Sequence, residues 1–189
     1  MSWHKRLLDL LLASIAASLL LLPCLLVSAA IKLTSRGPVV YWSQRVGQHN
    51  QLFLMPKFRS MRVDTPQLAT HLLTDPDAYL TPIGPFLRRT SFDELPQLWS
   101  IIKGDMSFVG PRPALFNQDD LIAQRTALGI DRLKPGLTGW AQVNGRDDLP
   151  IPVKVKYDQE YLERQSLAFD LKIIWRTALG VLKSDGVSH

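Results

Sequence analysis

The chain has 189 residues, of which 46% are hydrophobic, and carries a formal net charge of +5 at pH 7. Its single cysteine, Cys24, excludes the disulfide framework that small secreted domains use. Nucleic-acid binding is not indicated, because there is no basic helix with base-reading residues and no aromatic-rich sheet motif. No internal repeat or flexible linker is visible, and the residues after position 35 are enough for one domain.

The first predicted element is a helix over an apolar run of 22 residues, Leu10 to Ile31. A helix of that length just crosses a bilayer core of about 30 Å. Cations, which favour the cytoplasmic side, flank both ends of the run, and Pro23 favours a bend within it. We therefore expect residues 1–35 to form a re-entrant membrane helix, and residues 36–189 to form a domain at the cytoplasmic face.

Two other interpretations of the apolar run stay open. A helix that spans the bilayer tolerates a proline, and Ser28-Ala29-Ala30 resembles the cleavage site of a signal peptide, although the run is long for a signal. The flanking charges predict contact with anionic phospholipid headgroups. The net charge of this region is +3, because it contains four cations and one acid: Lys5, Arg6, Lys32 and Arg36, and Asp9.

A small β-hairpin is expected next. Residues 39–46 and 52–55 have strand patterns, the four residues between them have turn composition, and Pro56 is expected to end the second strand. Residues 57–62 then contain three cations and no acid. Residues 64–79 contain two prolines and predict short helices and loops.

The rest of the chain is mainly helical by pattern. In the second of the predicted helices Leu95, Leu98, Trp99 and Ile102 share one apolar face. The apolar stripe of the last one either packs on the core or lies on the membrane. Residues 109–113 are expected to be extended, and residues 134–146 to be loop-rich. The predicted fold class is α+β and mainly helical, with a re-entrant helix, a small hairpin and several short amphipathic helices at the membrane interface. The helices predicted after the hairpin cover residues 82–89, 92–103, 115–128, 153–164 and 169–182.

Two adjacent acids, Asp93 and Glu94, stand where a helix is expected to begin. One interpretation is structural: Ser91 and Glu94 have the spacing of a capping box. The other is chemical: the free N–H groups and the dipole of a helix start keep a carboxylate ionised and attract phosphate. An ionised carboxylate held beside a phosphate can attack phosphorus.

Adjacent residues on a helix point apart, so the two acids are expected to differ in role: one attacks and the other holds a metal. Two acids beside a diphosphate also need compensating charge, from Mg²⁺ and from Arg88, Arg89 and Arg112. The four histidines do not have the spacing of a zinc site, and no Walker or nucleophile-elbow sequence is present.

These residues belong to a longer series of recognisable segments in one order. On them the chain resembles the bacterial sugar transferases, the monotopic phosphoglycosyl transferases, over essentially its whole length. The matching segments are 5–9, 41–47, 57–61, 81–88, 93–98, 104–107, 109–113 and 134–146.

The resemblance implies the first membrane step of glycan assembly, at the cytoplasmic face of the bacterial inner membrane. A sugar 1-phosphate passes from a UDP-sugar to undecaprenyl phosphate by a ping-pong covalent mechanism, and UMP is released. Asp93 matches the nucleophile, and Glu94 matches the acid that engages Mg²⁺. The candidates for binding phosphate or substrate are Lys57, Arg59, Arg88, Arg112, Arg146 and Asp170.

The family also uses a re-entrant helix broken at a proline, often within Ser-Pro. Here the pair is Leu22-Pro23, so Ser18 and Ser28 are the candidate substitutes for the missing hydroxyl. The chain is expected to be the minimal catalytic form. Two alternative functions are a nucleotide-sugar diphosphate hydrolase, with both acids as metal ligands only, and a non-catalytic membrane scaffold.

Overall fold

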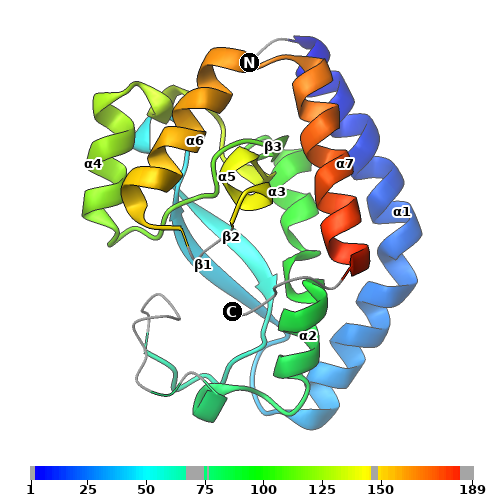
Figure 1. Cartoon of the computed structure of the whole chain (residues 1–189). Helices are drawn as coiled ribbons and strands as arrows, with labels where there is room; N and C mark the ends of the chain where they lie inside the picture. Colours follow the sequence, from blue (N-terminus) through cyan, green and yellow to red (C-terminus); the bar gives the residue numbers. More distant parts are fainter. Residues whose placement is uncertain (1–2, 67–74, 76, 146–148, 184–189) are drawn as a thin grey trace.

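The computed structural model describes residues 3–66, 75, 77–145 and 149–183. Within these residues the fold is α+β and mainly helical, with one long apolar helix and two small sheets, as the sequence predicted at this level. Figure 1 shows the long helix along one edge of the molecule. The helices are α1 (Trp3–Thr34), α2 (Gly84–Thr90), α3 (Gln97–Lys103), α4 (Asp119–Ala127), α5 (Trp140–Val143), α6 (Ile151–Arg164) and α7 (Leu167–Lys183).

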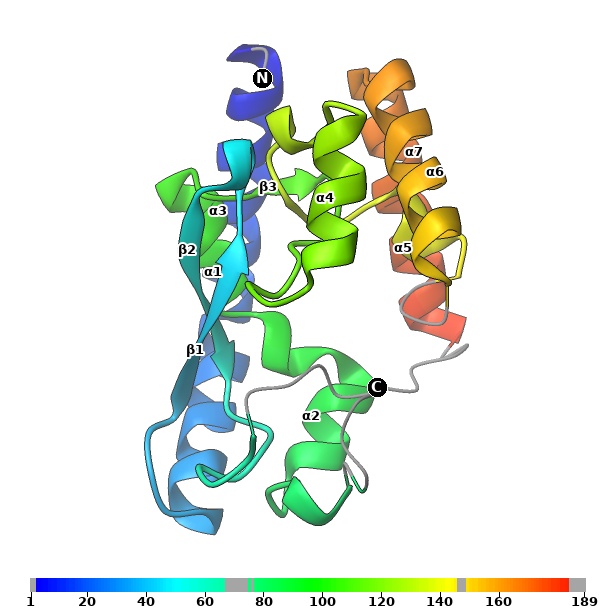
Figure 2. The same cartoon turned by 90° about the vertical axis from the view of Figure 1, so that its left-hand side faces the viewer.

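The predicted hairpin is confirmed, but its second strand is longer than expected. Strand β1 (Val40–Val46) pairs antiparallel with β2 (Leu52–Phe58). Pro56 does not end β2, because it lies opposite Trp42 inside the paired region. A two-stranded sheet leaves one side of each strand unpaired, so a residue without an N–H is tolerated there. In Figure 1 the hairpin lies between α4 on one side and α3 and α1 on the other, and in Figure 2 α1 runs behind it.

A second sheet was not predicted from the sequence. Strand β3 (Ser107–Val109) pairs in parallel with β4 (Gly136–Thr138), and α5 follows within the segment expected to be loop-rich. Gly136, one of the glycines that suggested a loop, is needed for the close approach of the two backbone segments. A Cβ at Gly136 would lie 2.1 Å from the backbone nitrogen of Gly110.

The prediction of a single helix over residues 92–103 is wrong. A 3₁₀ turn, Phe92–Glu94, precedes α3, and the capping box is absent because the Ser91 side chain makes no capping hydrogen bond. Ser91 instead has a left-handed backbone, with φ of 56°, and ends α2. The expected apolar face of this segment is also only partly buried, since Trp99 is 57% exposed.

Helix α1 continues through Pro23 and is curved along its length (Figure 1). The hydroxyls of Ser18 and Ser28 donate to the carbonyls of Ser14 and Cys24, each four residues back. Neither hydroxyl therefore reaches the carbonyl of Leu19, which Pro23 cannot serve because it has no N–H. The two serines do not substitute for the serine of the family motif.

The N-terminal end of α1 is fixed to the rest of the fold by polar contacts. Lys5 Nζ lies 2.6 Å from Asp170 Oδ2, and both side chains are buried. Arg6 donates to a carbonyl of α3, and Asp9 Oδ1 accepts a bond of 3.0 Å from the backbone N–H of Phe108. Two of the four flanking cations are thus used inside the protein. Lys32 and Arg36 are exposed, and the contact of the flanking cations with lipid headgroups stays a prediction.

The C-terminal end of α1 is fixed to the same folded unit. Ile31 is fully buried in a cluster with Phe58 and Leu87. Just beyond the helix, Arg59 Nη2 donates to Ser35 Oγ at 2.8 Å. Both ends of the long helix are therefore attached to the same folded unit.

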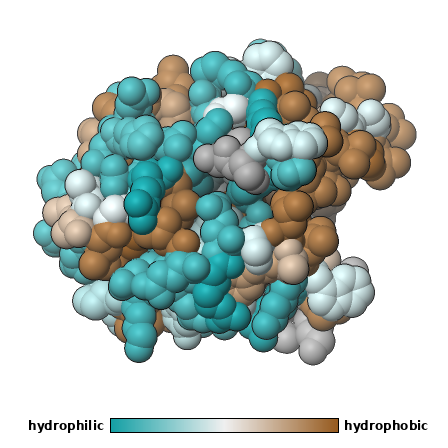
Figure 3. All heavy atoms as spheres, turned by 90° about the horizontal axis from the view of Figure 1, so that it is seen from above, coloured by the Kyte–Doolittle hydropathy of each residue, from teal (hydrophilic) through white to brown (hydrophobic). Residues whose placement is uncertain are grey.

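Large apolar side chains remain exposed on α1 and α7. In the described residues α1 is the one helix long and apolar enough to cross a membrane. In α7, Phe169 and Ile173 enter the core, whereas Leu171 and Trp175 are 52% and 65% exposed. Seen from the end where the N-terminus lies, apolar residues gather where α1 and α7 lie (Figure 3). The apolar stripe predicted for the last helix is therefore only partly buried in the core of the protein.

Candidate active site

The two acids meet a lysine from the hairpin. Asp93 and Glu94 lie in the 3₁₀ turn between α2 and α3. Lys57 Nζ, from β2, lies 2.8 Å from Glu94 Oε1 and 4.0 Å from Asp93 Oδ2. Arg112 Nη2 approaches the same Glu94 oxygen at 2.9 Å. The structure thus brings together four of the residues predicted from the sequence.

The local backbone explains this arrangement. The left-handed Ser91 ends α2, where its N–H bonds to the Arg88 carbonyl. The chain then closes the tight 3₁₀ turn, with the Glu94 N–H bonded to the Ser91 carbonyl. This turn packs against β2, and Asp93 is left only 7% exposed. The acids are therefore positioned by a turn and not by the start of a regular helix.

The same surroundings move the pKa values of the two carboxyls in opposite directions. Burial raises the pKa of Asp93 to about 6, against the lowering effect of the Lys57 charge. Burial also acts on Glu94, but the adjacent Arg112 and Lys57 outweigh it and hold the pKa of Glu94 well below its ordinary value. The expectation that a helix start keeps the pKa of the attacking carboxylate low is wrong for Asp93. At pH 7 and above Asp93 is nonetheless mostly ionised.

The two acids line two cavities of different character. Asp93 lines a cavity of about 400 Å³ whose lining includes five cations and no other acid. Glu94 and Arg112 line a second cavity, of about 370 Å³, that is mostly apolar. Its walls come from α1, α3, β3, β4 and α7. The two acids thus line different cavities, and the expectation that they differ in role stays a prediction.

The other predicted site residues lie in different environments. Arg88 is half-buried and lines the same cavity as Asp93. Arg59 also lines it, but its Nε donates to the Pro38 carbonyl at 2.6 Å and its Nη2 to Ser35, so it mainly fixes the end of α1. Arg89 is exposed.

Asp170 is placed in the interior and away from these contacts. Its partners are Lys5 and the Tyr161 hydroxyl, which donates to Asp170 Oδ1 at 2.7 Å. Arg146 lies outside the described residues. The contacts shown for Asp170 are those of a structural ion pair.

Sequence reasoning missed two further groups of residues. Arg125 donates to the backbone carbonyl of Arg112 and Arg45 to that of Pro113, and no spacing in the sequence indicates this. Thr138 and Thr177, whose hydroxyls lie 2.7 Å apart, are polar residues on the wall of the apolar cavity. Both come from segments whose contacts depend on the tertiary fold.

The pair of acids fits a Mg²⁺ ion that is shared with a substrate. Asp93 Oδ1 is buried, and within the described chain it has no hydrogen-bond partner. Nor do the described residues contain a group of three or more His, Cys, Asp or Glu that could hold a metal alone. Mg²⁺ often binds through one or two carboxylates together with substrate phosphates, which matches this donor set.

A family model described as bacterial sugar transferase matches residues 1–184, so the chain belongs to that family. The chain is 40% identical over 168 residues to the undecaprenyl-phosphate galactose phosphotransferase of Salmonella typhimurium, an overlap of 79% of this chain and 34% of the relative. It is 40% identical over 186 residues to the UDP-glucose:undecaprenyl-phosphate glucose-1-phosphate transferase of Xanthomonas campestris, covering 94% of this chain and 38% of the relative.

A shorter relative has nearly the same length as this chain. The uncharacterized sugar transferase EpsL of Bacillus subtilis is 38% identical over 190 residues, with 98% of this chain and 90% of the relative covered. The chain therefore spans about a third of the length of the first two relatives and most of the third. The family predicted from the sequence motifs is confirmed.

Proposed function

We propose that this chain transfers a sugar 1-phosphate from a UDP-sugar to undecaprenyl phosphate and releases UMP. The observation that carries the proposal is the pair of acids between two cavities, one basic and one apolar. The family membership and the printed names of two relatives support the same reaction. On this proposal residues 36–189 form the catalytic domain and residues 1–35 its membrane anchor.

The basic cavity suits the sugar nucleotide. Its cations, among them Lys57 and Arg88, offer charge-assisted hydrogen bonds to a diphosphate. Tyr41 and Trp42 on the same wall offer aromatic faces for a nucleobase. A diphosphate held there lies beside Asp93, the acid that this cavity contains.

The apolar cavity suits the prenyl end of the lipid acceptor. Ala16 and Leu20 of α1 and Ile174 and Ala178 of α7 provide hydrocarbon walls. Arg112 lies on the same lining and offers the guanidinium that a phosphate head requires. The cavity therefore has the chemistry to seat the phosphate and the first part of the chain of an isoprenoid phosphate.

The reaction proceeds in two displacements at phosphorus. Asp93, ionised, attacks the β-phosphorus of the UDP-sugar; the bond from that phosphorus to the bridging oxygen breaks, and UMP leaves with the electron pair. An acyl phosphate now joins Asp93 to the sugar. An oxygen of the lipid phosphate attacks the same phosphorus and frees the carboxylate. Lys57, Arg88 and Arg112 stabilise charge on the transferring group. Glu94 would hold Mg²⁺, which when bound would supply further neutralisation of the diphosphate charge.

The proposal includes a re-entrant α1, so that both of its ends lie on the cytoplasmic face of the inner membrane. What supports it is the attachment of both ends to one folded unit, through Lys5 and Asp170 at one end and Arg59 and Ser35 at the other. A re-entrant helix keeps both sets of contacts on one face of the bilayer, whereas a helix that spans the bilayer would place its two ends on opposite faces.

We expect single cysteines at positions 4 and 32 to react equally with a membrane-impermeant maleimide. The variants are His4→Cys and Lys32→Cys in a Cys24→Ser background, because Cys24 is the native cysteine. In inverted membrane vesicles both react, and in intact spheroplasts neither does. Leu19→Cys, in the middle of α1, is the unreactive control. Labelling of one end from each side contradicts the re-entrant helix.

The function itself is tested with the donor alone. Purified protein incubated with a UDP-sugar is expected to release about one UMP per protein molecule and to gain the mass of a sugar phosphate on Asp93. Adding undecaprenyl phosphate should discharge the adduct. A hydrolase would release product continuously without an adduct, and a scaffold would release none, so both alternatives are distinguishable in the same assay.

A further inference from the structure

The backbone around Arg112 is held through its carbonyl groups. Pro111 and Pro113 have no N–H, so this segment can accept hydrogen bonds more readily than it can donate them. Gly136 N donates to the Pro111 carbonyl at 2.9 Å. Arg45 Nη1 donates to the Pro113 carbonyl at 3.2 Å. The carbonyls on both sides of Arg112 are thus fixed by other elements.

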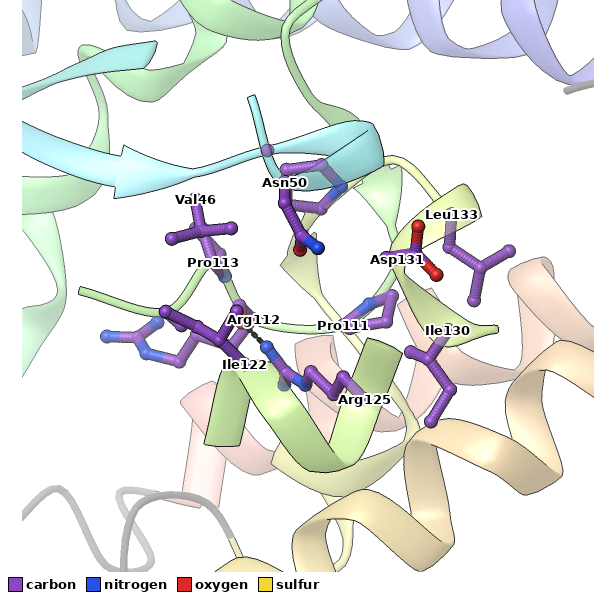
Figure 4. A pocket seen from close by; sticks show the side chains of 13 residues that line it. Val46, Asn50, Pro111, Arg112, Pro113, Ile122, Arg125, Ile130, Asp131 and Leu133 are labelled. Atoms are coloured by element: carbon purple, nitrogen blue, oxygen red, sulfur yellow. Dashed lines mark hydrogen bonds between the residues drawn. The ribbon is translucent and has the colours of Figure 1, made fainter. Parts of the chain in front are cut away.

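The carbonyl of Arg112 itself is held by a side chain from α4. Arg125 Nη1 donates to it at 2.8 Å, as the dashed line in Figure 4 shows. The rest of the guanidinium faces α6, where Nε and Nη2 lie 2.9 and 2.6 Å from Asp158 Oδ2. Arg125 and Asp158 are both buried. One planar side chain therefore joins α4, α6 and the Arg112 backbone.

We propose that the buried Arg125–Asp158 pair is a positioning device for Arg112, because it fixes the backbone from which the Arg112 guanidinium reaches Glu94. Arg125 and Asp158 themselves do not line the two cavities at the acids. They act through Arg112, whose Nη2 lies 2.9 Å from Glu94 Oε1. The kinetic consequence of this inference depends on the proposed function, whereas the geometric one does not.

The simplest alternative is that the ion pair only joins α4 to α6. An ion pair that only joins the two helices requires the two hydrogen bonds from Arg125 to Asp158. It does not require the third hydrogen bond, from Arg125 to the Arg112 carbonyl. The cavity beside the Arg112 turn, lined by Arg125 and Ile130, is small, about 30 Å³, or room for about one water. Loss of the third bond releases the Arg112 carbonyl and should therefore change the direction of the Arg112 side chain.

The main test is Arg125→Lys, which keeps a cation for Asp158 but lacks the planar fork that serves two acceptors. We expect UMP release at saturating UDP-sugar to slow by about tenfold or more. In an Arg112→Lys background the same change should add no more than about twofold, because residues that act as a unit are non-additive. A full additional loss in that background overturns the proposal.

The matched control is Leu121→Ala, which removes from the same helix a buried hydrocarbon side chain that makes no hydrogen bond to the Arg112 carbonyl. It should lower the melting temperature while the rate per folded molecule changes by less than about twofold. Equal rates for Arg125→Lys and Leu121→Ala contradict positioning. If Arg125→Lys fails to fold, the double variant Arg125→Met/Asp158→Leu removes both buried charges together and must show the same loss of rate.

A second measurement does not depend on activity. The chain has three glutamates, Glu94, Glu160 and Glu163, so ¹³C labelling of glutamate carboxyls gives three resonances. The Glu94 resonance at pH 7 is expected to move in Arg125→Lys and to stay in place in Leu121→Ala. An unmoved resonance in Arg125→Lys overturns the inference. Absence of UMP release by the wild-type protein instead contradicts the proposed function and leaves this measurement to decide.

Discussion

Asp93→Asn is expected to abolish the phosphosugar adduct and to slow UMP release by at least about 10³-fold, because an amide cannot attack phosphorus as a carboxylate does. The substitution is nearly isosteric, and burial already disfavours the charge of Asp93, whose pKa is raised to about 6. The melting temperature should therefore stay close to that of the wild type. Intact-protein mass spectrometry and a UMP assay with UDP-sugar alone measure the two effects.

The matched control is Asp105→Asn, which removes a carboxylate paired with Lys103 outside the two cavities. It should form the adduct at a rate close to that of the wild type. Normal adduct formation by Asp93→Asn would show that another group is the nucleophile. Loss of the adduct in both variants would point to a general effect of charge and not to a single attacking side chain.

Lys57→Met should shift the pH dependence of UMP release. In the wild type the rate should fall as the pH falls through about 6, since the pKa of Asp93 is raised to about 6 and only the ionised form attacks. Lys57 opposes that rise, so its removal should raise the Asp93 pKa further, by about one unit, and move the acid limb of the profile to higher pH. At pH 6 the variant should be about fivefold slower than the wild type on this account alone, because the ionised fraction of Asp93 falls from about one half to about one tenth.

The profile is measured as single-turnover UMP release between pH 5 and pH 9, with Lys103→Met as control. Lys103 forms an exposed ion pair with Asp105, so its loss should leave the acid limb unchanged. Partial recovery of the Lys57→Met rate at pH 8 and above is expected, because the nucleophile is ionised there. An acid limb that stays near 6 without Lys57 contradicts the assignment of this limb to Asp93.

The sequence predicted the mainly helical fold and the hairpin because periodicity reports which faces are apolar. It did not predict the sheet of β3 and β4, which depends on the close approach of Gly110 and Gly136 across 25 intervening residues. Nor did it predict that Ser91 is left-handed, because serine more often caps a helix than ends one. Such features depend on tertiary contacts that local pattern does not contain.

The sequence also predicted only part of the candidate active site. Motif order singled out Asp93, Glu94, Lys57 and Arg112, which the structure brings together. Arg59 and Asp170 carry the same kind of signal, but their contacts fix the ends of α1. The position of a charged residue in a recognisable motif indicates that the residue is important. It does not indicate which other residue or substrate the charge contacts. Roles for the site residues therefore rest on the experiments above, whereas the positions rest on the fold.

The attachment of α1 has a practical consequence for preparing the protein. Deleting the apolar helix to obtain a water-soluble fragment would strip Lys5 from the buried carboxylate of Asp170 and leave the Phe108 N–H without Asp9. An unpaired charge in that interior is costly, so the truncated fragment should aggregate even though its hydrophobic segment is gone. Purification should keep the whole helix in detergent or nanodiscs.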